Sequence, residues 1–193
     1  MKQYLTIPNA LTALRGLGVP LFIWLALDKQ ADGWAVFVLA IGGLTDYLDG
    51  KLARMWNQTS RFGELADPAI DRVYILATLI VLYLRDALPL WLIVILLGRD
   101  LILALVTIAL TRKGLPPLQV TYIGKAATFN LLYAFPLLLL ALNDSAVGTI
   151  AFIFGWAFAI WGVALYTFTG VSYFRSALNA IRVQPSNRII EID

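Results

Sequence analysis

The sequence contains neither cysteine nor histidine. Without cysteine, disulfide bonds, thiolate catalysis and zinc ribbons are excluded. Without histidine, any general base that works near neutral pH must be a carboxylate, a lysine or a metal-bound water. Charged residues are also scarce, because they make up 14% of the 193 residues, whereas 60% are hydrophobic. This composition predicts an integral membrane protein that consists of one domain.

Long apolar stretches define the expected helices. A helix of about 20 apolar residues spans the hydrocarbon core of a bilayer, and charged or turn-forming residues divide this chain into six such windows. The windows cover roughly 8–27, 33–54, 66–84, 89–111, 120–142 and 147–174. We therefore predict an all-α protein with six transmembrane helices in a single domain, residues 1–182, followed by a polar tail, residues 183–193.

The basic residues are unevenly distributed between the predicted loops. In an alternating topology with both termini on one side, that side collects most of the lysines and arginines. They are Lys2, Lys51, Arg54, Arg61, Arg112, Lys113, Arg175, Arg182 and Arg188. The opposite loops contain Lys29 and Arg85. Because lysine and arginine are enriched in cytoplasmic loops, we expect both termini and the region around Arg54 at the cytoplasmic face of the cell membrane.

Four aspartates lie inside or at the ends of apolar stretches, in two pairs, Asp46 with Asp49 and Asp67 with Asp71. Separations of three and four residues place each pair on one face of a helix. A single aspartate at a helix end could be merely a cap or an interfacial charge. Four together are different, because an ionised carboxylate costs about 2.5 to 3.5 kcal/mol at the centre of a membrane helix and like charges repel. Such a cluster requires counter-charges.

A divalent metal is the expected counter-charge. Arg54 and Arg72 cannot neutralise four carboxylates while leaving a pocket open. An all-oxygen ligand set favours a hard cation, magnesium or alternatively manganese, over zinc or copper. Two magnesium ions held by the aspartates and completed by substrate phosphates would form a phosphoryl-transfer site that faces the cytosol.

Small residues accompany the aspartates. Gly50 and Ala53 continue the helical face of the first pair, and Gly63 leads into that of the second. They would leave room for a bulky polar ligand beside the metals, and Gly50 would allow that ligand to approach the backbone. Alternatively, small residues let membrane helices pack closely, which is the interpretation that we favour for Gly42 and Gly43.

The acidic and small residues together form a pattern with fixed gaps, Asp46-x2-Asp49-Gly50-x2-Ala53-Arg54-x8-Gly63-x3-Asp67-x3-Asp71. At every position it resembles the signature of the CDP-alcohol phosphotransferases, membrane enzymes of phospholipid head-group synthesis. Other stretches resemble the bacterial enzymes that make phosphatidylglycerol phosphate or cardiolipin. They are Ile7-Pro8-Asn9, Thr12, Arg15, Arg54-Met-Trp56-Asn57-Gln58, Arg61-Phe62-Gly63 and Gly124-Lys125. The resemblance implies six transmembrane helices, a polar cavity open to the cytosolic face and a homodimer.

The resemblance also implies a reaction. CDP-diacylglycerol would place its diphosphate on two metal ions held by the four aspartates, and CMP would leave. The CDP site would be lined by Gly50, Ala53 and Arg54, with Gly63 from the same signature. Asp71 would in addition take the proton from the acceptor hydroxyl. The expected partners are CDP-diacylglycerol, a glycerol-type acceptor and membrane lipids, and we expect no nucleic acid.

Residues of the fourth and fifth windows bear on the acceptor. Phosphatidylglycerol phosphate synthases usually carry Arg-Glu and Gly-Lys-x-Lys-Thr where this chain has Arg99-Asp100 and residues 124–128, Gly-Lys-Ala-Ala-Thr. Lys125 is the best candidate for an acceptor contact, although it could simply extend toward anionic head groups. Arg99 and Asp100 could be a self-neutralising pair that only orients helices.

The missing second lysine favours an acceptor with less negative charge. A phosphomonoester carries about −1.5 to −2 near neutral pH and a phosphodiester about −1. We therefore expect phosphatidylglycerol as the acceptor, as in the CDP-dependent cardiolipin synthases, which Arg99-Asp100 also resembles. The alternative is glycerol 3-phosphate, the acceptor of a phosphatidylglycerol phosphate synthase. More distant alternatives are an intramembrane prenyltransferase, which would call for a longer chain, and a cation transporter, which would not need the adjoining Gly50, Ala53 and Arg54.

Overall fold

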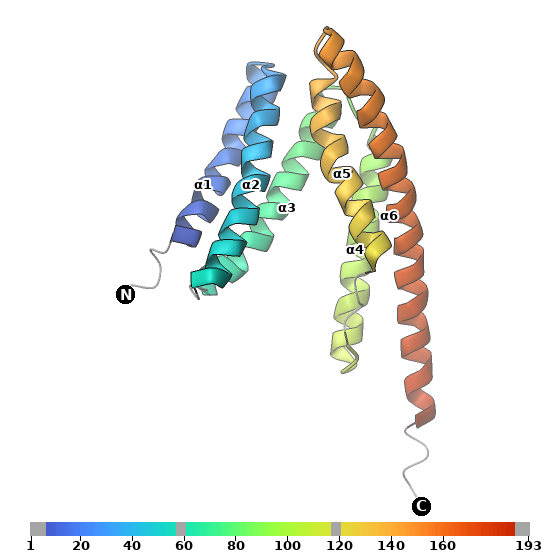
Figure 1. Ribbon diagram of the computed structural model, residues 1–193. Helices are drawn as coiled ribbons and strands as arrows, with labels where there is room; N and C mark the ends of the chain where they lie inside the picture. Colours follow the sequence, from blue (N-terminus) through green and yellow to red (C-terminus); the bar gives the residue numbers. More distant parts are fainter. Residues whose placement is uncertain (1–6, 57–60, 117–120, 188–193) are drawn as a thin grey trace, which may run out of the picture. The chain divides into compact units, whose positions relative to one another are not determined.

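The computed structural model describes residues 7–56, 61–116 and 121–187, and these residues form helices and short connections without a strand. Figure 1 shows the order of the elements along the chain. They are α1 (Ile7–Ile23), the π-helical turn η1 (Trp24–Asp28), α2 (Asp32–Trp56), α3 (Arg61–Leu84), α4 (Leu90–Arg112), α5 (Tyr122–Leu140) and α6 (Ala146–Asn187). Each predicted apolar window overlaps a helix, and α6 extends well beyond its window, so the predicted all-α fold is confirmed for the described residues.

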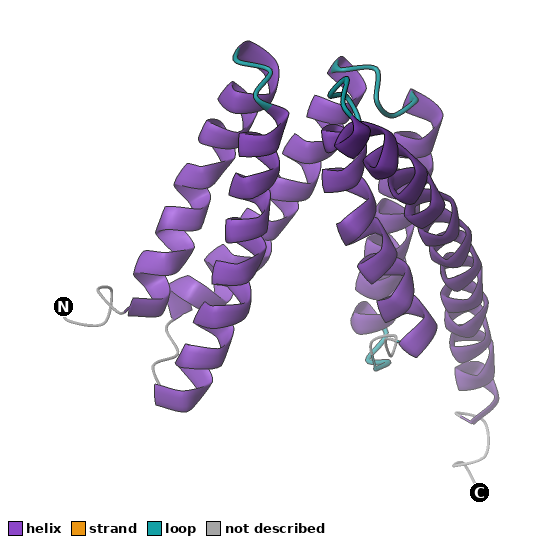
Figure 2. Ribbon diagram, turned by 45° about the horizontal axis from the view of Figure 1, so that its top comes forward, coloured by secondary structure: helices purple, strands orange, loops and turns teal. Residues whose placement is uncertain are grey.

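The helices belong to two compact units. The first contains the residues up to Leu88 together with Phe135–Gly155, and the second contains Pro89–Ala134 together with the residues from Trp156 onward. In Figure 2, helices and loops account for all the coloured residues of both units. The single domain over residues 1–182 with a tail over 183–193 stays a prediction, although α6 continues to Asn187.

Helix α1 leads through η1 directly into α2. Pro20 lies inside α1, where it cannot donate a backbone hydrogen bond to the preceding turn. The wider π-helical turn follows within one turn, as expected where the regular hydrogen-bond ladder is perturbed. Gln30, with φ of 50°, reverses the chain before Asp32 begins α2. The short connection makes α1 and α2 antiparallel neighbours.

An arginine connects the turn between α1 and α2 to the end of α3. Arg85, just after α3, contacts both carboxylate oxygens of Asp32 at 2.9 and 3.3 Å and donates to the carbonyl oxygen of Ala26. Asp32 is buried. Because a buried carboxylate needs a partner, this ion pair joins the start of α2 to the end of α3 and to η1.

Two glycines bring α1 and α2 close to α3. A Cβ atom at Gly18 would overlap the Tyr74 hydroxyl, and one at Gly42 would lie 3.3 Å from Cζ of the same tyrosine. Both helices therefore use a missing side chain to accommodate one ring of α3. The packing interpretation is confirmed for Gly42, whereas Gly43 faces open space.

The second unit also contains close helix contacts. Added Cβ atoms at Gly162 and Gly170 of α6 would lie 2.8 Å from Leu131 and 2.9 Å from Arg99, respectively. Helix α4 ends in a Schellman motif, in which Leu115 N–H donates to Leu110 and Gly114 N–H donates to Thr111, both at 3.0 Å. Gly114 supplies the required positive φ of 71°.

Three helical segments of the described residues are long and apolar enough to cross a membrane: Leu90–Arg112, Tyr122–Leu140 and Ala146–Ile181. Large apolar side chains on α4 and α6, such as Leu101 and Trp161, are exposed. Such surfaces are suited to lipid rather than water. The remaining three spans, the placement of the termini and the cytosolic cavity stay predictions.

Candidate functional site

The predicted acidic site lies on α2 and α3. Asp46 and Asp49 both belong to α2, and Asp67 and Asp71 both belong to α3. Their spacings of three and four residues thus place each pair on one helical face, as predicted. The structure describes the side chains of Asp46 and Asp71. The other predicted site side chains on these two helices lie outside the described part of the chain, namely Asp49, Ala53, Arg54 and Asp67, as do the surroundings of Gly50 and Gly63.

A buried arginine of α1 joins the two described aspartates. Nη1 of Arg15 donates to Oδ1 of Asp46, and Nη2 of Arg15 lies 3.5 Å from Oδ1 of Asp71. The Arg15 side chain is 1% exposed, whereas those of Asp46 and Asp71 are 45% and 47% exposed. One cation that is shielded from solvent therefore contacts carboxylates from two different helices, while both carboxylates remain accessible.

Arg15 was missing from the predicted site, for which only Arg54 and Arg72 were considered as cationic side chains and a divalent metal was the expected counter-charge. The signal was nevertheless in the sequence. Arg15 lies inside the first apolar window, and no acidic residue occurs within the same helix. A cation in such a helix requires a partner from another helix, and the four aspartates were the obvious candidates.

Two carboxylates that converge from neighbouring helices fit a divalent metal in part. Their ligand atoms are oxygens, which hard cations prefer, and about half of each side chain is open to an approaching ion. No group of three potential metal ligands occurs among the described residues. Asp49 and Asp67 lie one helical turn from Asp46 and Asp71, but their side chains are outside the described part of the chain. The four-aspartate metal site therefore stays a prediction.

The second unit contains the residues predicted to contact the acceptor. Nη1 of Arg99 lies 3.0 Å from Oδ1 of Asp100, and the Tyr166 hydroxyl donates to the same carboxylate oxygen. The Arg99 guanidinium lies 4.0 Å from the centre of the Tyr166 ring and 5.8 Å from that of Tyr173. Arg99 and Asp100 thus form an ion pair, which the Tyr166 hydroxyl connects to α6; that the pair only orients helices stays a prediction.

Tyr173 also fixes the start of α5. Its hydroxyl accepts a hydrogen bond from the Thr121 N–H at 2.8 Å and shares another with Oγ1 of Thr121. Oγ1 of Thr121 in turn accepts from the Gly124 N–H at 3.2 Å. Lys125 follows directly, and its Nζ lies 5.5 Å from the centre of the Tyr122 ring. Its predicted acceptor contact is not tested by this geometry.

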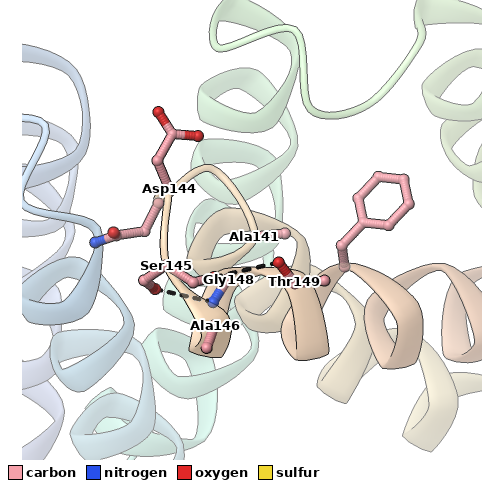
Figure 3. Close-up of a pocket in the computed structure, with 8 residues that line it drawn as sticks. Ala141, Asp144, Ser145, Ala146, Gly148 and Thr149 are labelled. Carbon is pink, nitrogen blue, oxygen red and sulfur yellow. Dashed lines mark hydrogen bonds between the residues drawn. The ribbon is translucent and has the colours of Figure 1, made fainter.

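A cavity outside the predicted site lies at the loop between α5 and α6 (Figure 3). It has a volume of about 600 Å³. The Gly148 N–H donates to Oγ of Ser145 at 3.1 Å, and Oγ1 of Thr149 donates to the Ser145 carbonyl oxygen at 3.3 Å. These bonds are those of a serine that caps the start of a helix. The lining of the cavity includes none of the predicted site residues.

Comparison with known proteins gives consistent matches. A family model described as CDP-alcohol phosphatidyltransferase matches residues 5–161. The chain is 55% identical over 176 residues to the CMP-forming cardiolipin synthase of Streptomyces coelicolor, covering 89% of this chain and 82% of that protein. It is 41% identical over 184 residues to a Mycobacterium tuberculosis protein provisionally named a cardiolipin synthase, covering 95% and 88%. Another protein of that organism, provisionally named a phosphatidylglycerophosphate synthase, is 34% identical over 181 residues, covering 90% and 82%.

The contacts of Arg15 predict a specific loss of stability. Replacing Arg15 with alanine should lower the free energy of unfolding by about 2 kcal/mol, because two charge-assisted contacts disappear and the two carboxylates then repel each other. Adding Asp46→Asn should restore part of the loss, since the repulsion is relieved. Denaturant unfolding in detergent micelles with a chelator measures both effects.

Arg175→Ala is the matched control, because Arg175 is exposed on α6. It should change the free energy of unfolding by no more than about 0.5 kcal/mol. Equal effects of Arg15→Ala and Arg175→Ala would show that the Arg15 contacts do not stabilise the fold.

Proposed function

Because this chain belongs to the CDP-alcohol phosphatidyltransferase family, we propose that it transfers the phosphatidyl group of CDP-diacylglycerol to a hydroxyl of phosphatidylglycerol, forming cardiolipin and CMP. The observation that carries this proposal is the 55% identity to a CMP-forming cardiolipin synthase over 89% of the chain. The similarity to a protein provisionally named a phosphatidylglycerophosphate synthase is lower, at 34%. Glycerol 3-phosphate is therefore the second candidate acceptor.

The charge balance of the second unit supports the less charged acceptor. Asp100 and the ring of Tyr166 already surround the Arg99 guanidinium. After Lys125, two alanines occupy the positions before Thr128. The segment 124–128 thus has one lysine where the Gly-Lys-x-Lys-Thr pattern has two, which suits a phosphodiester with about one negative charge better than a phosphomonoester.

The aspartates of α2 and α3 are proposed to hold two magnesium ions, with manganese as an alternative. The metal ligands would be Asp46, Asp49, Asp67 and Asp71. When bound, magnesium neutralises the diphosphate and the charge that develops on the leaving oxygen. Asp71 takes the proton from the acceptor hydroxyl, and Arg15 keeps the Asp46 and Asp71 carboxylates together.

The nucleotide is proposed to lie beside these aspartates. Gly50, Ala53 and Arg54 line its site on α2, and Gly63 begins the corresponding face of α3. Lys125 contacts the acceptor phosphate. This arrangement binds the donor by its diphosphate and nucleotide, so that the acyl chains stay in the bilayer.

The protein is a membrane protein, and its proposed topology has six spans with both termini and the active site at the cytoplasmic face of the cell membrane. The excess of basic residues in one set of loops supports this orientation. A homodimer is proposed from the family resemblance alone.

Product analysis tests the acceptor. Purified protein in detergent micelles is incubated with radiolabelled CDP-diacylglycerol and magnesium, with phosphatidylglycerol or glycerol 3-phosphate supplied in turn. We expect labelled cardiolipin and stoichiometric CMP with phosphatidylglycerol. Phosphatidylglycerol phosphate as the sole product would establish the second candidate instead, and no CMP release with either acceptor would exclude both.

Substitution of the aspartates tests their roles. Asp71→Asn should lower turnover by about 10²–10⁴-fold through loss of the general base while retaining CMP binding, measured by calorimetry. Asp46→Asn should weaken magnesium-dependent CMP binding as well. Asp144→Asn, in the exposed α5–α6 loop, is the control and should behave like the unchanged protein. Turnover that persists in Asp71→Asn would rule out its role as base, and activity in excess chelator would rule out the metal.

Cysteine labelling tests the orientation, since the chain has no cysteine of its own. Asp144→Cys should react with an impermeant maleimide in intact cells, because the α5–α6 loop lies on the outer side in the proposed topology. Ser60→Cys and Ser186→Cys should react only after the membrane is permeabilised. The reverse pattern would place the active site on the opposite face.

A further inference from the structure

An open groove with a volume of about 420 Å³ runs between α1 and α2 in the first unit. Its two walls consist of large apolar side chains that are exposed to the surroundings of the protein. They include Leu14, Leu17 and Leu21 from α1 and Trp34, Phe37 and Ile41 from α2. Spacings of three and four residues place each set on one helical face. We refer to this feature as the α1–α2 groove.

The groove has one polar end, and that end is at the predicted diphosphate site. Arg15 and Thr45 line the groove, and Arg15 contacts both Asp46 and Asp71. Because α1 and α2 are antiparallel, the bond between Arg15 and Asp46 sets their register. The opposite end, near Leu25 and Trp34, lies at the turn between the helices.

Glycines deepen the middle of the groove. Gly18 and Gly42 both line it, and behind them lies the ring of Tyr74 from α3. With no side chain at either position, the base of the groove is the hydroxyl-bearing end of the Tyr74 ring. The groove is therefore apolar along both walls, with one phenol group at its base.

The length of the groove suits a single fatty acyl chain. From Leu14 to Leu25 the helix rises by about 16 Å, at 1.5 Å per residue. Half of a bilayer core, the depth occupied by the acyl chains of one leaflet, is about 15 Å. An acyl chain that starts at Arg15 would therefore reach the turn near Trp34.

We propose that the α1–α2 groove binds one acyl chain of the phosphatidyl donor, with the donor phosphates at the end formed by Arg15 and Asp46. This assignment rests on the proposed function. The donor is the occupant because the groove opens beside Asp46 and Asp71, which are proposed to hold its diphosphate. The groove thus contributes to the recognition of a lipid-linked substrate over a water-soluble nucleotide.

A groove-filling variant tests the proposal through chain-length dependence. Leu21 lies about 9 Å along α1 from Arg15, beyond the reach of a six-carbon chain. Leu21→Trp should raise the KM for dioleoyl CDP-diacylglycerol at least tenfold. The KM for the dihexanoyl donor should change less than threefold. Leu105→Trp, at an exposed position on α4 outside the groove, is the matched control and should change neither value.

The possible outcomes distinguish a failure of the groove assignment from a failure of the proposed function. If the unchanged protein releases no CMP from either donor, the proposed function fails. If it is active but Leu21→Trp keeps the same ratio of KM values for long and short donors, the groove assignment is overturned. A donor with a photoreactive diazirine near the end of one acyl chain supplies a second measurement, which requires neither turnover nor a folded variant.

Photolysis with the unchanged protein should label residues 17–25 and 34–41. An excess of unlabelled CDP-diacylglycerol should reduce this labelling at least fivefold, whereas phosphatidylethanolamine should not. Labelling spread evenly over the exposed faces of α4 and α6, or reduced equally by both lipids, would identify bulk lipid as the occupant and overturn the proposal.

Discussion

The contact of the buried Arg15 guanidinium with Asp46 and Asp71 is the interaction on which the first unit depends. Arg15 lies in an apolar helix, where an isolated cation would be strongly unfavourable. Its partners come from α2 and α3, so the electrostatic requirement of one side chain determines how three helices meet. The same contact sets the register of α1 against α2, and with it the position of the polar end of the α1–α2 groove.

Two other arginines, Arg85 and Arg99, follow the same rule. Arg85 is neutralised by Asp32, and Arg99 by Asp100 with two aromatic rings beside it. The first pair joins α2 to the residue that follows α3. The second pair lies within α4 and is connected to α6 through Tyr166. Buried ion pairs are weak sources of net stability but discriminate strongly against arrangements that separate the partners. In this protein they specify which helices are neighbours.

The sequence was sufficient for the helices and for the acidic pattern, but not for the contacts. Hydropathy located α4 closely because its ends, Leu90 and Arg112, coincide with changes from apolar to polar residues. It did not predict that α6 continues to Asn187, because hydropathy marks residues suited to lipid rather than the end of a helix. The Arg15 contacts join residues that are 31 and 56 positions apart, and periodicity within single helices carries no information about such pairs.

Two ion pairs of α3 and the residue after it also limit how the helices of the first unit can move. Arg15 contacts Asp71 near the middle of α3, and Arg85, just after the end of α3, contacts Asp32. A slide of α3 by one helical turn, about 5.4 Å, would break both contacts at once. Axial sliding of α3 is therefore disfavoured at two points along it, and the softer motion is bending within a helix. Helix α1 has a place for it, because the π-helical turn after Pro20 already departs from regular geometry.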